Sequence, residues 1–230
     1  MGLSHSPSIV LDGLLFYIDV YNQRSYPGTG VSIINLVNLV SGIGDSATAI
    51  SASGGILFGT NKNSFVDANL TVSNTAYTKI CWFNLDDTTT YQPLICGTNS
   101  TRHCMWMNKT AKLTASHSNT SSFSTPVFTS VAGNTTLSTG VWYFGAVTYS
   151  SSSGFNIYLN GVLDQTSAST QTFGASSTQN YVGFFGDFFT SPALPTLNGK
   201  IGPVMIYNKV LTASEILKLY NASKRRFGLS

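Results

Sequence analysis

The chain has 230 residues, of which 42% are hydrophobic and only 9% are charged, and its formal net charge is +3. This composition provides enough apolar side chains for one sizeable core, and the shortage of charge excludes a coiled coil or a disordered polyelectrolyte. A net charge this small does not suggest a nucleic-acid groove, which needs Lys and Arg clustered along one face. The 14 Phe and 11 Tyr residues indicate strands.

Hydrophobic residues come in short runs that mostly alternate with period two, and turn residues separate the runs at roughly eight- to twelve-residue intervals, which is typical of an all-β sandwich. In chain order, the predicted strands are 13–19, 56–58, 77–84, 92–96, 104–107, 112–116, 142–149, 155–159, 162–165, 181–185 and 200–208. One more short strand is expected near Val127, Phe128 and Val131. No Pro-rich linker or charge run divides the chain, so we expect one domain.

Two local motifs are specific. Asn160-Gly161 joins two β-type runs and can supply the positive φ angles of a type I′ turn, which predicts a hairpin of 155–159 with 162–165. Thr212-Ala-Ser-Glu215 is a capping box, with Leu211 and Ile216 in the two positions of a hydrophobic staple. These signals predict a single helix over 212–222.

The three cysteines, Cys81, Cys96 and Cys104, are odd in number, lack metal-ligand spacing and lie among apolar residues. We therefore expect reduced, buried thiols and synthesis in a reducing compartment. The first residues lack the basic and apolar regions of a signal peptide, and no apolar run reaches the 18 or so residues of a membrane helix.

Several motifs follow one another from the hairpin to the helix. They are Phe155-Asn-Ile-Tyr-Leu-Asn-Gly161, Tyr181-Val-Gly183, Leu197-Asn-Gly-Lys-Ile201, Val204-Met-Ile-Tyr-Asn-Lys-Val-Leu-Thr-Ala-Ser-Glu-Ile216 and Tyr220-Asn221. This ordered series resembles the concanavalin A-like lectin/glucanase superfamily, in particular its laminin G-like domains. The segments 8–19, 25–28 and 225–228 are similar to the beginning and end of such domains in structural proteins of tailed bacteriophages.

The resemblance implies a two-sheet antiparallel jelly roll with one short C-terminal helix, which agrees with the strand pattern. We expect an N-terminal arm over 1–12, a jelly roll over 13–222 that includes the helix 212–222, and a basic C-terminal tail over 223–230. The inner faces of the sheets are expected to bury Trp142, Phe144, Tyr158, Phe184 and Ile206.

No catalytic centre is expected. Glycosidases use two facing carboxylates, but the one glutamate, Glu215, belongs to the helix cap, and Asp86-Asp87 are neighbours in an expected turn. His103 and Cys104 are adjacent on a predicted strand, so their side chains should point to opposite faces. No metal or cofactor is predicted either. Calcium is the alternative, with Asp19, Asn22 and Asp187 as the candidate oxygen ligands.

Two groups of residues are candidates for contacts with other molecules. Exposed aromatic, amide and charged side chains on loops can bind carbohydrate or a neighbouring subunit, and the candidates are Tyr91, Arg102, Trp106, Phe185, Asp187 and Phe188. The C-terminal tail, with Lys224, Arg225, Arg226 and Phe227, is a candidate for docking onto an acidic partner surface.

These observations and the resemblance favour a non-enzymatic virion protein of a tailed phage, synthesised in the host cytoplasm. A head decoration protein is the first hypothesis; a tail-fibre or tail-tip adhesin that binds host-surface carbohydrate is the alternative, and a free carbohydrate-binding module is the third. The expected partners are the major capsid protein or tail proteins, further copies of the chain in a homo-oligomer, and a host-surface glycan. No nucleic acid or membrane is expected as a partner.

Overall fold

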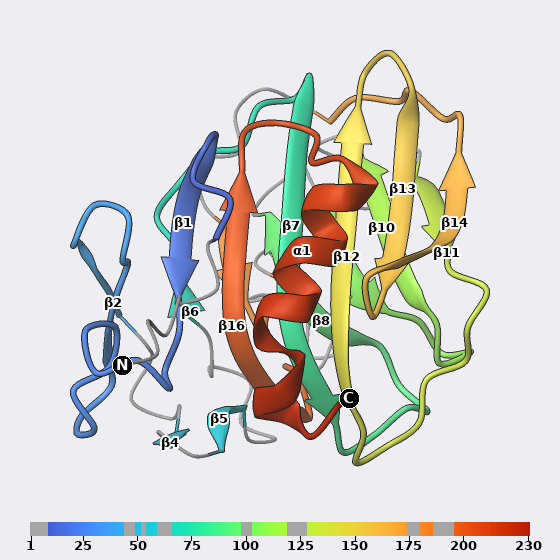
Figure 1. Ribbon diagram of the computed structural model, residues 1–230. Helices are drawn as coiled ribbons and strands as arrows, with labels where there is room; N and C mark the ends of the chain where they lie inside the picture. The colour runs from blue at the N-terminus through green and yellow to red at the C-terminus, as the bar shows by residue number, and fades with distance from the viewer. Residues whose placement is uncertain are drawn as a thin grey trace.

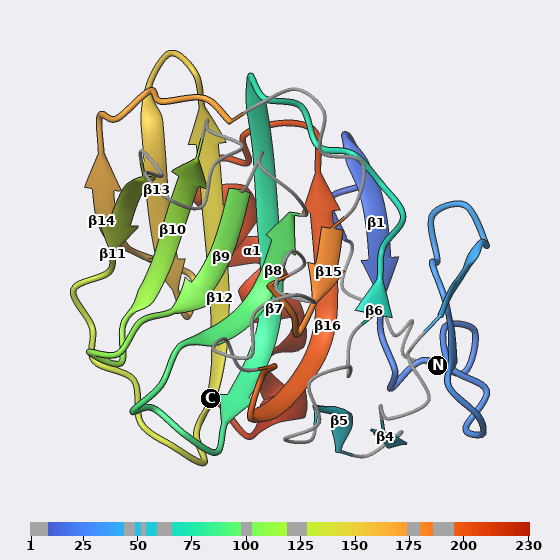
Figure 2. The same ribbon diagram turned by 180° about the vertical axis from the view of Figure 1, so that it is seen from behind.

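The computed structural model describes residues 9–43, 49–51, 54–58, 66–97, 103–118, 128–173, 180–185 and 196–230. Within them, two antiparallel sheets lie face to face, and a C-terminal helix covers the outer face of the larger sheet (Figures 1 and 2). The predicted two-sheet sandwich with one short C-terminal helix is therefore confirmed. No helix among the described residues has both the length and the apolar composition needed to span a bilayer.

The larger sheet has eight strands. Their spatial order is β14 (Val162–Ser167), β13 (Gly154–Leu159), β12 (Trp142–Ser150), β7 (Ala76–Leu85), β16 (Gly199–Tyr207), β5 (Gly55–Phe58) and β4 (Ala49–Ser51), and β1 (Leu14–Ile18) also pairs with β16. The long strands β7, β12 and β16 form the middle of this sheet. The nearly continuous apolar run of β12 is typical of a central strand.

The smaller sheet has six strands. Their order is β11 (Phe128–Ala132), β10 (Leu113–Ser118), β9 (His103–Met107), β8 (Gln92–Gly97), β15 (Asn180–Val182) and β6 (Val66–Asp67). A separate hairpin is formed by β2 (Ser32–Ile34) and β3 (Ser41–Ile43). The sequence did not predict β2, β3, β4 and β6, because two or three residues are too few to show an alternating pattern.

The predicted hairpin is confirmed. Strands β13 and β14 pair across Asn160 and Gly161, whose φ angles are 51° and 80°. The predicted strand 181–185 is shorter in the structure, because it ends at Val182, before Gly183. Gly183 has a φ of 78°, and a Cβ atom there would lie 2.3 Å from the Phe58 ring. This positive φ lies outside the β region, so the strand ends before Gly183, and a side chain at this position would collide with the Phe58 ring.

Both faces of the central strands of the larger sheet are buried. The inter-sheet core contains alternate residues of each central strand, such as Phe83, Val147 and Ile206. A second apolar cluster lies between the sheet and the helix, and it contains Trp82, Phe144, Tyr158, Met205, Ile216 and Leu219 with part of Trp142. The expectation that Trp142, Phe144 and Tyr158 face the other sheet was wrong, because hydrophobicity alone does not distinguish two buried faces.

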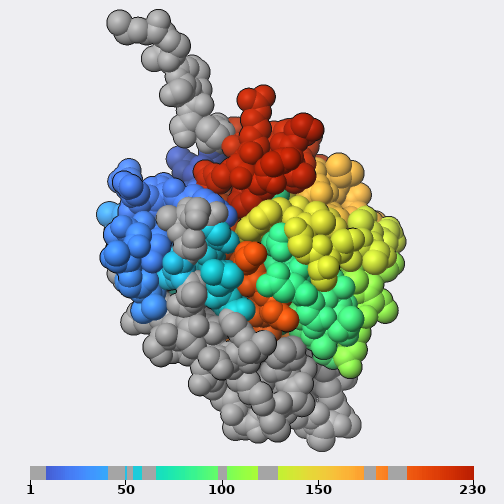
Figure 3. Space-filling model, turned by 90° about the horizontal axis from the view of Figure 1, so that it is seen from below, coloured from blue at the N-terminus to red at the C-terminus, as the bar shows by residue number. Residues whose placement is uncertain are grey.

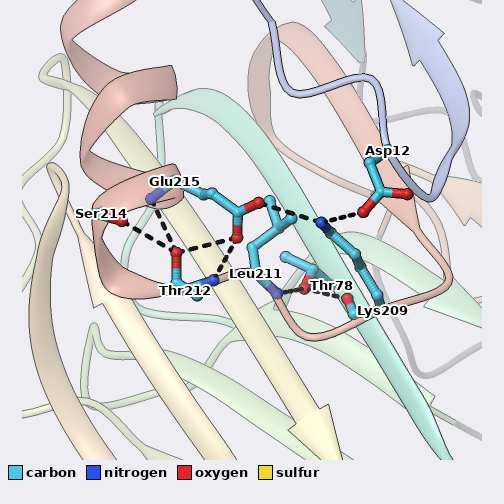
Figure 4. A network of polar contacts seen from close by, with 7 residues as sticks. All are labelled: Asp12, Thr78, Lys209, Leu211, Thr212, Ser214 and Glu215. Atoms are coloured by element: carbon cyan, nitrogen blue, oxygen red, sulfur yellow. Dashed lines mark hydrogen bonds and ion pairs between the residues drawn. The ribbon is translucent and has the colours of Figure 1, made fainter.

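The helix α1 (Ala213–Ser223) begins at the predicted capping box (Figure 4). The Thr212 hydroxyl accepts from the Glu215 amide at 3.2 Å, and the Glu215 carboxylate accepts from the Thr212 amide at 2.7 Å. The Lys209 ammonium joins this carboxylate to Asp12, at 3.1 and 2.7 Å. The Thr78 hydroxyl donates to the Lys209 carbonyl and accepts from the Leu211 amide, which attaches the helix start to β7. Glu215 therefore has a structural role.

Candidate functional site

A cleft of about 560 Å³ lies between β1 with its following turn and the end of α1. The N-terminal part of the described chain (dark blue) and its C-terminal part (red) lie side by side in Figure 3. We call this cleft the terminal cleft. It is lined by Ile9, Tyr17, Asp19, Tyr21, Asn22, Gln23, Arg24, Pro203, Met205, Leu219, Ala222, Ser223 and Arg226. The polar side chains come mainly from residues 17–24, and the 3₁₀ helix η2 (Lys224–Phe227) adds Arg226.

Among the described residues, Asp19 is the only carboxylate that lines the terminal cleft, and its side chain is just 2% exposed. A buried carboxylate requires compensating partners, because burial removes its hydration. Its Oδ2 atom pairs with Nη1 of Arg226 at 2.6 Å and accepts from the Tyr17 hydroxyl at 3.2 Å. Its Oδ1 atom accepts from the Tyr21 amide at 3.1 Å. Both oxygens of Asp19 therefore have partners within the protein.

Arg226 is held over the cleft by the residue that follows it. The Phe227 ring stacks on Trp82 at 4.1 Å and packs against Trp142 at 4.7 Å, which fixes η2 to the outer face of the larger sheet. The Arg226 guanidinium lies 5.5 Å from the centroid of the Tyr21 ring, a cation–π distance, and its side chain remains 41% exposed. A cationic group and an aromatic face are thus presented together.

The hydroxyls of both tyrosines in the cleft remain neutral at physiological pH. Burial raises the pKa of Tyr17 above its ordinary value of 10.0, and the Asp19 carboxylate raises it further. Burial also raises the pKa of Tyr21, although the positive charge of Arg226 opposes this shift. The Tyr17 hydroxyl donates its proton to Asp19 and can accept a further hydrogen bond, whereas the Tyr21 hydroxyl can donate and accept.

The structure gives several predicted contact residues internal partners. Arg226 and Phe227, expected in a docking tail, pack on the chain itself, and Lys224 lies 5.6 Å from the centroid of the Tyr220 ring. Arg225 is exposed. Docking of this segment onto a partner stays a prediction, and only part of its surface is available for it. At the other end, Ile9 of the expected N-terminal arm packs against the helix-covered cluster.

The calcium candidates have no free carboxylate oxygen in the described part of the chain. Both oxygens of Asp19 are occupied, and the Asn22 side-chain oxygen accepts from the Arg24 amide. Asp187 lies outside the described residues. Among the residues that the structure describes, no group of three or more His, Cys, Asp or Glu side chains could hold a metal ion.

Three of the predicted carbohydrate or subunit contacts form an aromatic cluster on the outer face of the smaller sheet. The Tyr91 and Trp106 rings lie 5.3 Å apart, and Trp106 lies 6.1 Å from Phe185. Phe185 is 7% exposed, so it is not the exposed platform that we expected, whereas Tyr91 and Trp106 are half-buried. Arg102, Asp187 and Phe188 lie outside the described residues. We call Tyr91, Trp106 and Phe185 the aromatic cluster.

A second polar group, which we call the inter-sheet cluster, is fully enclosed between the sheets and consists of Tyr77, Lys79, His103 and His117. The Lys79 ammonium donates to the carbonyls of Ile95 and His103 and to Nδ1 of His103, at 3.1, 2.7 and 2.7 Å. Burial lowers the pKa of Lys79 to about 8, which leaves it charged at neutral pH.

The two histidines of the inter-sheet cluster are neutral. The His103 pKa is lowered, first by burial and then by the charge of Lys79, and burial lowers the pKa of His117 to about 4. The Tyr77 hydroxyl contacts Nε2 of His117 at 2.8 Å, and Nδ1 of His117 donates to the Gln171 carbonyl at 2.7 Å. Cys104, next to His103 on β9, lies in the cluster on the opposite face of its sheet, so the two side chains diverge as the sequence predicted.

Sequence reasoning missed Tyr17, Tyr21 and Arg24 as components of a site. The alternation Tyr17-Ile-Asp19 was a usable signal for the first two of the cleft's polar residues, because side chains two residues apart point to the same side of an extended chain. The alternate residues Ile18 and Val20 enter the inter-sheet core. No comparable signal links this segment to Arg226, which is 207 residues away in the sequence.

Comparisons with known proteins agree with this architecture. A family model described as the concanavalin A-like lectin/glucanases superfamily matches residues 58–217. Comparison with curated protein sequences gives no match. The family model stops short of residues 17–24 and of Arg226, which provide the polar lining of the terminal cleft.

Three solved structures illustrate the similarity. The binding domain of Paraclostridial Mosquitocidal Protein 1 has a TM-score of 0.71 and 14% identity, over 95% of this chain and 55% of that chain. The ligand-binding domain of botulinum neurotoxin serotype D, in complex with N-acetylneuraminic acid, has a TM-score of 0.68 and 11% identity, over 91% of this chain and 51% of that chain. The Trypanosoma rangeli sialidase has a TM-score of 0.67 and 14% identity, over 98% of this chain and 36% of that chain. At these identities the similarity shows the fold alone, and this chain spans about half of the two binding domains and about a third of the sialidase.

Proposed function

Because the chain belongs to the concanavalin A-like lectin/glucanases superfamily, we propose that it is a non-enzymatic carbohydrate-binding domain and that its site is the terminal cleft. The observation that carries this proposal is the pairing of the Tyr21 ring with the half-exposed guanidinium of Arg226. Sugars present apolar C–H faces, which pack on aromatic rings, and hydroxyls, which bind planar polar groups. A volume of about 560 Å³ is in the range of small-molecule sites.

Two of the structural neighbours support a saccharide as the ligand class. One is described in complex with N-acetylneuraminic acid, and another is a sialidase. Their matched regions are 51% and 36% of their chains, so the sugar site of either protein need not lie in the shared domain. The proposal for this chain therefore depends on its own cleft.

The absence of catalysis is also a proposal, and the state of the carboxylates supports it. Glycoside hydrolysis generally needs one carboxylic acid and one carboxylate on opposite sides of the scissile bond. In the described residues, Asp19 has partners at both oxygens, Glu215 caps α1, and Asp87 accepts hydrogen bonds from Thr89 and Thr90 in its own turn. None of these three is free to transfer a proton in a cleft.

We further propose that the domain serves in the virion of a tailed phage. The segments whose sequence resembles phage structural proteins, 8–19 and 225–228, contribute Tyr17, Asp19 and Arg226 to the terminal cleft. A ligand cleft formed by these segments favours a tail-fibre or tail-tip adhesin over a head decoration protein, which needs no glycan site. Other virion proteins and further copies of this chain are the proposed partners in the particle.

Binding to a panel of bacterial surface glycans and purified oligosaccharides tests the site. Tyr21→Ala should abolish binding that the unmodified protein shows, whereas Arg225→Ala, an exposed arginine outside the cleft, should leave it unchanged. Trp106→Ala tests the aromatic cluster as the competing site. Loss of binding only in Trp106→Ala would move the site to the smaller sheet, and no glycan binding by the unmodified protein would contradict the proposed function.

The location in the particle needs a separate measurement. Electron microscopy of purified virions, with an antibody against this chain, should show it at the tail. Labelling of the capsid surface would restore the decoration hypothesis, and particles without the chain would contradict a virion role.

A further inference from the structure

We infer that the terminal cleft selects acidic saccharides, with Arg24 and Arg226 binding the anionic group of the sugar. The inference rests on the proposed function and adds the charge of its ligand. It follows from which hydrogen-bonding groups of the cleft are already occupied and which remain available.

Both oxygens of Asp19, the carboxylate in the described cleft lining, already accept hydrogen bonds from the protein. Asp19 receives hydrogen bonds from Arg226, Tyr17 and the Tyr21 amide, and its side chain is 2% exposed. A neutral sugar commonly donates its hydroxyls to a free carboxylate, and the described lining of the cleft offers none. The charged groups in the described lining that remain available to a ligand are therefore the cationic donors.

The guanidinium groups of Arg24 and Arg226 still have N–H donors available to a ligand. Arg226 uses Nη1 for Asp19, and its other guanidinium nitrogens have no hydrogen-bond partner among the described residues. The Arg24 side chain is exposed and likewise has none in the described part of the chain, since only its backbone amide is bonded, to Asn22. Two guanidinium groups and one carboxylate belong to the described lining of the cleft, which leaves a local charge of +1 for an incoming anion to neutralise.

The geometry prepares Arg226 for this role. Phe227 is anchored on Trp82, and the Asp19 pair fixes one edge of the guanidinium, so little side-chain freedom is lost when a ligand binds. Guanidinium groups form paired, charge-assisted hydrogen bonds with carboxylate, sulfate or phosphate oxygens, which are stronger than bonds to neutral hydroxyls.

Arg24 lies between the terminal cleft and a second groove, into which a longer ligand could extend. A neighbouring groove of about 410 Å³ shares Ile9, Tyr17, Asn22 and Arg24 with the terminal cleft. Its remaining lining is apolar and consists of Leu11, Leu14, Leu36 and Val37. An anionic group bound at Arg24 would therefore lie at the junction of a polar cleft and an apolar groove, which leaves room for a second sugar unit.

Matched pairs of ligands test the inference by isothermal titration calorimetry. One pair is 3′-sialyllactose and lactose; another is an oligoglucuronate and its neutral glucose counterpart; a sulfated oligosaccharide separates sulfate from carboxylate as the anion. We expect the acidic member of a pair to bind at least about tenfold more tightly, and its affinity to fall as salt is raised.

Variants of the full chain assign the effect to the cleft. Arg24→Gln should reduce the affinity for the acidic sugar about tenfold and that for the neutral sugar much less, whereas Arg225→Gln, the matched exposed arginine, should change neither. Arg226→Lys, checked for an unchanged fold by circular dichroism, should give a loss of similar size because lysine cannot form the paired bonds.

The outcomes separate the two proposals. Tight binding of a sulfated but not a carboxylated sugar still supports an acidic ligand. Equal binding of acidic and neutral sugars, both weakened by Tyr21→Ala but not by Arg24→Gln, would overturn this inference and retain carbohydrate binding. No binding of any saccharide would overturn both.

Discussion

The inter-sheet cluster and the terminal cleft each place a basic side chain beside a tyrosine ring, at 5.6 Å for Lys79 and Tyr77 and 5.5 Å for Arg226 and Tyr21. Lys79 is fully buried, and all three of its N–H donors have acceptors within the chain. Arg226 is half-exposed and has donors left over after its pair with Asp19. The comparison separates a basic group that stabilises the fold from one that is available to a ligand.

If this distinction is correct, the largest effect on stability should come from Lys79→Met. The substitution keeps the volume but leaves the carbonyls of Ile95 and His103 and the His103 Nδ1 atom without their donor in the core. We expect the free energy of unfolding to fall by about 3 kcal/mol or more, measured by urea denaturation. Lys200→Met, on the same sheet but only half-buried, is the control and should change it by less than about 0.5 kcal/mol. Equal effects would contradict the structural role of Lys79.

Acid should weaken the fold through His117. In the unfolded chain this histidine takes up a proton below about 6.5, whereas burial lowers its pKa in the folded protein to about 4. The unfolded state therefore binds more protons between these values, so stability is complete above pH 6.5 and decreases by about 3 kcal/mol as the pH falls to 4.

Chemical denaturation across this pH range, compared with His117→Gln, measures the effect. The variant should be less stable at pH 7 and should lose this part of the pH dependence. Parallel profiles for the two proteins would assign the acid sensitivity to other groups.

Phe227→Ala should have a smaller effect on stability and a clear effect on the cleft. The ring is half-buried against Trp82 and Trp142, so its removal should cost about 2 kcal/mol, less than the roughly 3–5 kcal/mol of a fully buried phenylalanine. It should also loosen Arg226 and weaken glycan binding. Phe227→Leu, which retains apolar contact, should restore most of the thermal stability measured by differential scanning fluorimetry. Unchanged stability in the alanine variant would contradict the docked position of η2.

Arg24→Gln should have the smallest effect on stability. The side chain is exposed and has no hydrogen-bond partner among the described residues, so the free energy of unfolding should change by less than about 0.5 kcal/mol. Its role is in binding alone. If Arg24→Gln lost as much stability as Lys79→Met, Arg24 would contribute to folding, and the distinction between a stabilising lysine in the core and ligand-binding arginines in the cleft would be wrong.

Much of the fold was predictable because its signals are local. Asn160-Gly161 specified a hairpin turn, and Thr212 with Glu215 specified the start of a helix, because backbone angles and caps depend on adjacent residues. The direction of side chains was less predictable. Trp142 and Phe144 were expected between the sheets and lie under α1, since an apolar strand covered on both sides carries no alternation to identify its faces.

The candidate site was predicted only in fragments. Asp19 was identified as a possible cation ligand and Arg226 as part of a docking tail, and neither expectation connected the two residues. In the structure they form one ion pair beside Tyr21. The predicted aromatic residues Tyr91, Trp106 and Phe185 do come together, but on a different sheet from the cleft.

The sequence by itself determined the class of fold, its hairpin and its helix, because each depends on composition or on neighbouring residues. Only the tertiary structure decided that Lys79 is enclosed and that Arg226 meets Asp19 across 207 residues. The physical reason is that the strength and availability of a charged group depend on its burial and partners. Those are supplied by segments far apart in the chain, and no local pattern encodes them.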